Sequence, residues 1–141
     1  MTPQRVTLIT LGVADLSRAR GFYDALGWVA TDGAEGVVFY QISGMVLGLF
    51  PLVELAKDQN RPGTPLGTGA VTLAQNFETV AEVDAAFAKA LSVGATALKA
   101  PEKVFWGGYS GYYADPDGHV WELAHNPFWP LNADGSLTLP A

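Results

Sequence analysis

The sequence predicts an α+β fold in which one module occurs twice, each time as a strand, a helix and about three further strands. Residues 6–13 and 71–77 are rich in β-branched and apolar side chains, and each run is followed by apolar residues at helical spacing. Both modules then continue into a hairpin that turns at a glycine, Gly44 in the first and Gly118 in the second. We therefore expect two βαβββ modules whose curled, four-stranded mixed sheets surround a cleft.

The first module opens with the strand 6–13 and continues into a helix. Asp15 is a natural N-cap, because its carboxylate accepts hydrogen bonds from the free backbone N–H groups at a helix start. Gly27 is a natural residue just beyond the helix end, where a left-handed conformation is common. The apolar stripe between them consists of Leu16, Ala19, Phe22, Tyr23 and Leu26. A hairpin over 37–50 closes the module.

The second module repeats this order. Thr79 and Glu82 have the spacing of a capping box, and Gly94 ends the helix that follows. The helix carries the apolar stripe Val80, Val83, Phe87, Ala90 and Leu91. A second hairpin runs over 112–124. Its turn, 115–118, reads Asp-Pro-Asp-Gly, which is the preferred residue order of a type I turn.

The module boundaries divide the chain into a single domain and a tail. We expect the domain to cover residues 1–126, with the first module at about 5–50 and the second at about 70–126. Residues 51–69 are rich in proline and glycine, which predicts a connector. Residues 127–141 form a C-terminal tail, which we expect to pack on its own domain or on a partner subunit.

Composition excludes several classes of protein. Apolar residues make up 49% of the chain, which is too many for a disordered protein. The lack of cysteine rules out disulfides, thiolate zinc sites and cysteine nucleophiles. A formal charge of −6 and eight scattered Lys and Arg residues argue against a nucleic-acid partner, and no apolar run is long enough to span a membrane. Residues 1–5 do not lead into a signal peptide, so we expect a cytoplasmic protein.

Two motifs resemble those of a known family. Residues 11–16, followed by Phe-Tyr and Leu-Gly within 22–27, resemble the opening of vicinal oxygen chelate proteins, which include glyoxalases, bleomycin-resistance proteins and extradiol dioxygenases. Residues 115–123 resemble the Asp-Pro-Asp-Gly…Glu-Leu closing motif of the same superfamily. The resemblance covers about 5–126. It implies the glyoxalase/bleomycin-resistance/dioxygenase fold, a small-molecule ligand, a homodimer and, in many members, a divalent metal.

The closing motif places one carboxylate in the expected cleft. Glu122 matches the glutamate that commonly binds metal in this superfamily. Strand alternation puts it on the face opposite Trp121 and Leu123, which we expect to pack on a helix. The counterpart of Glu122 in the first hairpin, counted from the turn glycine, is Gly48, which offers no ligand.

The first strands offer little more to a metal. The resemblance implies a ligand, commonly His, at the position of Leu8. Aligning the modules on their helix-ending glycines gives Gln75 as its counterpart, with Asn76 or Thr72 as alternatives. None of these is a strong ligand, and a catalytic metal typically needs three protein ligands. We expect no resident cofactor; any divalent metal would be held by Glu122 with Gln75.

The two histidines do not complete a catalytic site. Alternation places His119 and His125 on the face opposite Glu122, and neither has a credible nucleophile nearby. Glu122 itself can act as a general acid or base, or accept a hydrogen bond from a ligand. It can equally be a relic that hydrogen-bonds Gln75 or a tyrosine.

Residues 104–113 are the most unusual stretch, with five aromatic residues and three glycines. Aromatic side chains offer large apolar surfaces with polar tips, as small-molecule pockets require. The sequence thus predicts a protein that binds a small apolar or aromatic molecule without a strongly held metal, as the drug-sequestering branch does. The alternative is a metal-dependent lyase, isomerase or dioxygenase of the glyoxalase type. We take Glu122 as the catalytic candidate. The substrate-binding candidates are Phe39, Gln75, Asn76, Trp106, Tyr109 and Tyr112.

Overall fold

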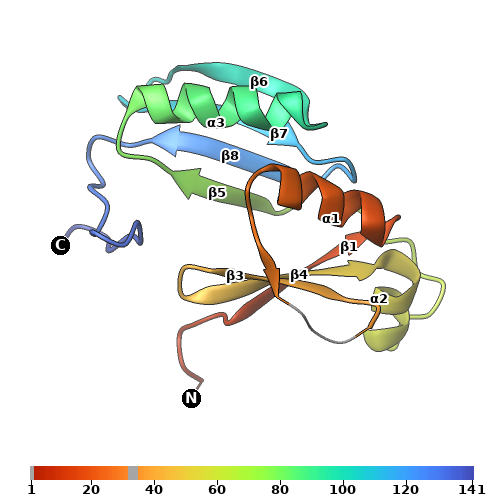
Figure 1. Cartoon of the computed structure of the whole chain (residues 1–141). Helices are drawn as coiled ribbons and strands as arrows, with labels where there is room; N and C mark the ends of the chain where they lie inside the picture. Colours follow the sequence, from red (N-terminus) through yellow and green to blue (C-terminus); the bar gives the residue numbers. More distant parts are fainter. Residues whose placement is uncertain (1, 32–34) are drawn as a thin grey trace. The chain divides into compact units, whose positions relative to one another are not determined.

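The computed structural model describes residues 2–31 and 35–141 (Figure 1). The chain divides into two compact units, Met1–Gly67 and Thr68–Ala141, called here unit 1 and unit 2. Each unit holds one four-stranded sheet with a helix packed on one face. Within the described ranges, no helix is long and apolar enough to cross a membrane.

Unit 1 follows the predicted order of strand, helix and three strands. Its elements are β1 (Leu8–Val13), α1 (Leu16–Ala25), β2 (Ala30–Thr31), β3 (Val38–Ile42), β4 (Met45–Pro51) and α2 (Leu52–Asp58). The strand order is β1-β4-β3-β2, with β1 parallel to β4 and the other pairs antiparallel. The first strand therefore pairs with the last, and α1 connects β1 to β2 at the opposite edge of the sheet.

Unit 2 has the same topology. Its elements are β5 (Thr72–Asn76), α3 (Val80–Ser92), β6 (Thr96–Lys103), β7 (Tyr109–Ala114) and β8 (Val120–His125). The strand order is β5-β8-β7-β6, again with only the first and last strands parallel. The repeated βαβββ module and the α+β class predicted from the sequence are confirmed.

The predicted helix ends are also confirmed. The Asp15 carboxylate accepts a hydrogen bond from the backbone N–H of Arg18 at 3.1 Å, and the Thr79 hydroxyl accepts one from the N–H of Glu82 at 3.1 Å. Gly94 has a φ of +118°, the left-handed conformation that a side chain would strain. Both helices thus begin and end where short-range signals in the sequence place them.

The helix α2 lies inside the segment 51–69, which the sequence predicts as a connector. At seven residues it is too short to show clear periodicity, and the prolines and glycines after it dominate the pattern. Its place on the sheet is set by Gly12. A Cβ at that position would lie 2.7 Å from Leu52 and 3.1 Å from Leu55, so the glycine makes room for the helix on β1.

The helix-facing side of the unit 1 sheet forms a packed core that includes a buried tyrosine. Leu47 and Leu49 are fully buried and Tyr40 is 1% exposed. The Tyr40 hydroxyl donates to the Asp24 carboxylate at 2.8 Å and lies 3.2 Å from the Arg20 carbonyl oxygen. Burial raises the pKa of Tyr40, and the hydrogen bond and negative charge of Asp24 raise it further. The phenol therefore ties β3 to α1 in its protonated form.

Replacing Tyr40 with phenylalanine tests whether its hydrogen bond to Asp24 stabilises the packing of α1 on β3. We expect Tyr40→Phe to lower the free energy of unfolding near neutral pH by about 1 kcal/mol through the lost hydrogen bond. A raised pKa stabilises the fold fully below the ordinary tyrosine value of 10.0 and less as the pH rises above it. Urea unfolding across that range should show the stabilities of the two proteins converging at alkaline pH. A difference independent of pH would contradict the assignment.

The turn between β7 and β8 is organised by a buried aspartate. Asp115 is 3% exposed, and its Oδ1 accepts hydrogen bonds from the backbone N–H groups of Asp117 and His119, both at 2.9 Å. The N–H of Gly118 donates to the Asp115 carbonyl at 2.9 Å, as a type I turn requires. This turn sets where β8 begins, and so sets the register of Glu122.

The C-terminal tail offers a matched control for this turn. Asp134 accepts from the N–H and hydroxyl of Ser136 in a similar way, but it is exposed. We expect Asp115→Ala to cost about 1–3 kcal/mol of stability, because it leaves buried donors unpaired, and Asp134→Ala to leave stability almost unchanged, because its hydrogen bonds are exposed to water. Thermal unfolding of both variants tests this. Equal losses of stability in the two variants would show that the buried Asp115 turn does not stabilise the fold more than the exposed Asp134 turn.

Candidate functional site

Pairing register and alternation define the sheet face of unit 1 that α1 does not cover. The register pairs Leu8 with Val46, and places Thr10, Gly48 and Phe39 in one row across three strands. These side chains alternate with the buried residues that face α1. This face, which α2 covers only at its Gly12 end, therefore carries mostly apolar side chains.

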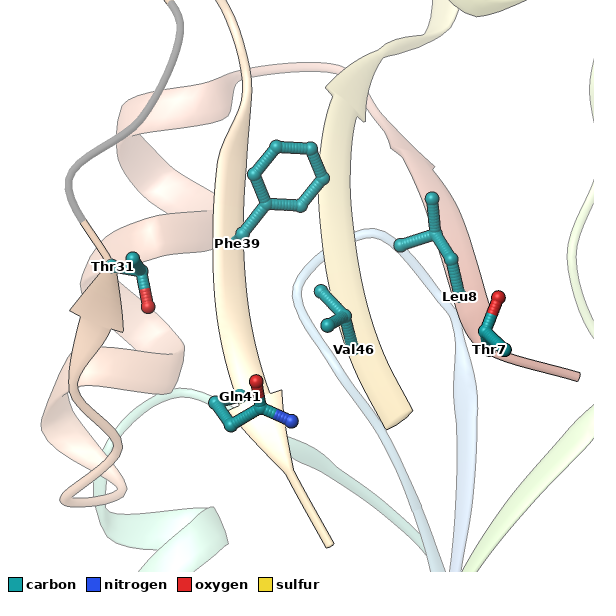
Figure 2. A pocket seen from close by; sticks show the side chains of 6 residues that line it. All are labelled: Thr7, Leu8, Thr31, Phe39, Gln41 and Val46. Carbon is teal, nitrogen blue, oxygen red and sulfur yellow. The ribbon is translucent and has the colours of Figure 1, made fainter. Parts of the chain in front are cut away.

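A cavity of about 470 Å³ lies on this face. We call it the unit 1 cup; it is lined by Thr7, Leu8, Thr31, Phe39, Gln41 and Val46 (Figure 2). The side-chain nitrogen of Gln41 donates to the carbonyls of Ile42 and Met45, both at 3.0 Å. Its side-chain oxygen has no hydrogen-bond partner among the described residues, so the cup presents a polar acceptor beside its apolar wall.

The floor of the cup depends on a missing side chain. A Cβ at Gly48 would lie 3.2 Å from the Phe39 ring and 3.6 Å from a Leu8 methyl group. Figure 2 shows Phe39 leaning from β3 toward β4, with Leu8 on the far side of that strand. Gly48 therefore keeps open the space that the Phe39 ring and the cup occupy.

The corresponding face of unit 2 carries the predicted carboxylate. Trp121 and Leu123 are 4% and 1% exposed, while the intervening Glu122 lies on the other face, as alternation predicts. Glu122 is flanked by Ala74 on β5 and Tyr112 on β7. Burial raises the pKa of Tyr112, and the charge of Glu122 and its hydrogen bond with the phenol raise it further. The Glu122 carboxylate thus favours the protonated form of the phenol beside it.

Gln75 does not share this face. It is paired with Leu123, so its side chain lies on the α3 side of the sheet, whereas Thr72 and Asn76 lie on the side of Glu122. The expectation that Gln75 accompanies Glu122 is therefore corrected by the register. Thr72 and Asn76, the two alternatives, have the required orientation.

The misplacement of Gln75 has a physical cause. Alignment of the modules on their helix-ending glycines makes Gln75 the counterpart of Leu8 only if the two helices have equal length. In the structure α3 has 13 residues and α1 has 10. The strand register instead pairs Leu8 with Val46 and Thr72 with Val120, each two residues after its turn glycine. Thr72 is thus the true counterpart of Leu8, three residues before Gln75.

Tyr109, one of the aromatic candidates, also lies away from Glu122. Tyr109 pairs with His125 on the α3 side, and its hydroxyl donates to Asp84 of α3 at 2.7 Å. This hydrogen bond raises the pKa of Tyr109. Trp106 folds back over Gly108, where a Cβ would collide with the indole ring. The expectation that Tyr109 borders the same cup as Glu122 is therefore wrong, whereas the role of Trp106 stays a prediction.

The donor set does not fit the divalent metal that the resemblance implies. On the faces away from α1 and α3, the first and last strands hold Leu8, Thr10 and Gly48 in unit 1, and Thr72, Ala74 and Glu122 in unit 2. Apart from the one carboxylate, none is a strong ligand for zinc, nickel or iron. Across residues 2–31 and 35–141, no group of three or more His, Asp or Glu side chains is arranged to hold an ion.

No functional role is predicted for His125 from the sequence. His125, at the end of β8, lines two cavities of about 380 and 260 Å³ at one end of the unit 2 sheet. Its Nδ1 lies 3.0 Å from the carbonyl oxygen of Phe77. His125 and Tyr109 face the same side of the sheet because they are paired across β7 and β8. The sequence alone does not show this pairing.

The family model of the Glyoxalase/Bleomycin resistance protein/Dioxygenase superfamily matches residues 5–123. The chain belongs to this superfamily. A glyoxalase-related enzyme from Fulvimarina pelagi is 37% identical, covering 99% of this chain and 100% of that one, with a TM-score of 0.88. An uncharacterized protein of Mycobacterium tuberculosis H37Rv is 34% identical over 88% of this chain and 75% of its own length.

More distant members of the superfamily share the fold. A lactoylglutathione lyase from Agrobacterium tumefaciens matches with a TM-score of 0.70 at 24% identity, over 93% of this chain and 100% of that one. At this identity the likeness shows the architecture alone. The specific substrate must therefore be inferred from the side chains of this member of the superfamily.

The effect of Glu122 on Tyr112 can be tested by titration. We expect Glu122→Gln to lower the pKa of Tyr112, because the carboxylate charge is removed, but not to its ordinary value, because burial, which is the largest cause of the raised pKa, remains. Carbon-13 NMR titration of labelled tyrosines measures this, with Tyr109 as the internal control, since its pKa depends on Asp84. An unchanged Tyr112 pKa would refute the pairing.

Proposed function

We propose that this superfamily member binds a small apolar or aromatic molecule in the unit 1 cup, without a resident metal. The observation that carries the proposal is the cup itself, an apolar cavity of about 470 Å³ beside a few polar groups. Ligand pockets are typically about 300–1,000 Å³ and have this mixture of lining.

The lining determines the ligand chemistry. Phe39, Leu8 and Val46 offer an aromatic ring and branched aliphatic groups against which a flat ligand can pack. The side-chain oxygen of Gln41 can accept a hydrogen bond from a ligand hydroxyl or amide. The Thr7 hydroxyl can donate or accept. We infer an uncharged aromatic or aliphatic ligand with at least one hydrogen-bond donor.

For unit 2 we propose that Glu122 exchanges a proton with a ligand. The phenol of Tyr112 lies beside Glu122 on β7, and a ligand hydroxyl can take the place of this phenol as a hydrogen-bond donor. Asn76 lies on the same face and can orient a polar group. A general base of this kind needs no metal, and the glyoxalase-related enzyme of Fulvimarina pelagi supports an enzymatic role. A metal-dependent reaction would need ligands that these faces do not hold.

We further propose that the protein works as a homodimer. The edge strand β6 is exposed along most of its length, and Leu98 on it is 54% exposed. Sheet edges with unpaired backbone groups and exposed apolar side chains are commonly covered by a partner. The register shifts between β6 and β7 and the lysines on β6 favour cover by a specific partner over open-ended strand addition.

Filling the cup should abolish binding. With 2-naphthol as the probe, we expect Gly48→Leu to weaken affinity by at least about tenfold, or 1.4 kcal/mol, because the new side chain displaces the Phe39 ring into the cavity. Gly21→Leu is the matched control, because nothing lies within 4 Å of a Cβ at that position. Isothermal calorimetry measures both variants.

The same experiment can overturn the proposal. If folded Gly48→Leu protein binds 2-naphthol as tightly as the unchanged protein, the ligand does not occupy the cup. Phe39→Ala provides a second variant that removes the ring without filling the space, and it should also weaken binding. Circular dichroism of each variant shows whether the fold is retained.

A further inference from the structure

A second site, separate from the proposed cup, lies where β8 ends and α3 begins. The larger cavity there has a volume of about 380 Å³ and is lined by Val80, Lys103, Val104, Gly107, Gly108, Tyr109, His125 and Pro127. These residues come from β6, β7, β8, the start of α3 and the loops between them. A smaller cavity of about 260 Å³ shares His125 and Pro127 with it.

The hydrogen bond to Phe77 determines the tautomer of His125. A carbonyl oxygen can only accept, so the Nδ1 that lies 3.0 Å from it carries the proton. In the neutral ring the lone pair is then on Nε2. Within the described part of the chain, Nε2 has no hydrogen-bond partner. The imidazole ring, which the Phe77 carbonyl holds in place, therefore offers a hydrogen-bond acceptor at the edge of both cavities.

The two cavities differ in the charged side chains that line them. Lys103 lines the larger one, which has no carboxylate in its lining, whereas Glu78 lines the smaller one. The neighbouring carboxylate of Glu102 lies 3.4 Å from Lys99, so it is paired with a different lysine. Asp84 accepts the Tyr109 hydroxyl at 2.7 Å. Lys103 is thus the charged side chain in the lining of the larger cavity.

Much of the remaining lining of the larger cavity is apolar. Val80, Val104 and Pro127 line the cavity, and Gly107 is covered by the Phe128 ring, which a Cβ would meet at 3.0 Å. The Gly107 turn is closed by hydrogen bonds between Val104 and Gly108 and between Gly107 and Val104 at 2.9 and 3.0 Å. A ligand here needs a flat apolar body, an anionic group for Lys103 and a hydroxyl for His125.

We propose that this cavity binds a small aromatic hydroxy acid, with its carboxylate at Lys103, its hydroxyl donating to Nε2 of His125, and its ring against the apolar wall. The volume of about 380 Å³ lies in the range of small-ligand pockets. The site is independent of the unit 1 cup, so either can exist without the other.

The test is a titration of the full chain with 4-hydroxybenzoate, followed by nitrogen-15 NMR. We expect saturable shifts at the backbone amides of Gly107 and Gly108 and at Nε2 of His125. Lys103→Ala should weaken binding about tenfold through the lost charge-assisted contact. Lys89→Ala, a lysine in the last turn of α3, is the matched control and should bind normally.

The role of the imidazole is tested with a variant that retains its structural bond. His125→Asn keeps a side-chain N–H at the Nδ1 position for Phe77 and removes Nε2. It should weaken 4-hydroxybenzoate binding but leave benzoate, which has no hydroxyl to donate, unchanged. The proposal is overturned if Lys103→Ala binds normally, if His125→Asn affects both compounds equally, or if the shifts do not saturate at these residues. Shifts confined to the unit 1 cup would overturn it without affecting the function proposed for that cup.

Discussion

The alternation of side chains along paired strands is the constraint on which the functional surfaces depend. In each unit the first strand lies parallel to the last, and a helix covers one face of the sheet. Pairing Gly48 with Thr10, and Glu122 with Ala74, decides which residues point away from the helix. A slip of one residue would exchange the two faces. The Asp115 turn, directly before β8, opposes such a slip.

The same repeated fold carries different chemistry in its two halves. Equivalent positions hold Gly48 in unit 1 and Glu122 in unit 2. The glycine makes room for Phe39 and an apolar cup, whereas the glutamate pairs with Tyr112. This asymmetry distinguishes the chain from superfamily members whose equivalent positions carry several strong metal ligands. Divergence at a few face positions changes the chemistry without changing the packing against the helix.

Features fixed by local physical signals were predictable from the sequence, and features set by pairing were not. Helix caps at Asp15 and Thr79 and the face of Glu122 follow from short-range patterns. Gln75 was misplaced because the two helices differ in length, which no local pattern reports. Tyr109 belongs to the α3 side because of its pairing with His125. The aromatic composition of its segment indicates a pocket but not which face of the sheet forms it.

The central claim is that these faces bind an organic ligand and provide one carboxylate instead of a metal site. Its most direct test is the metal content of protein produced with zinc, nickel, manganese and iron supplied, measured by elemental mass spectrometry after gel filtration. The account predicts well under one equivalent of any transition metal per chain, because catalytic sites typically use about three protein ligands. One retained equivalent that the Glu122→Gln variant releases would contradict it.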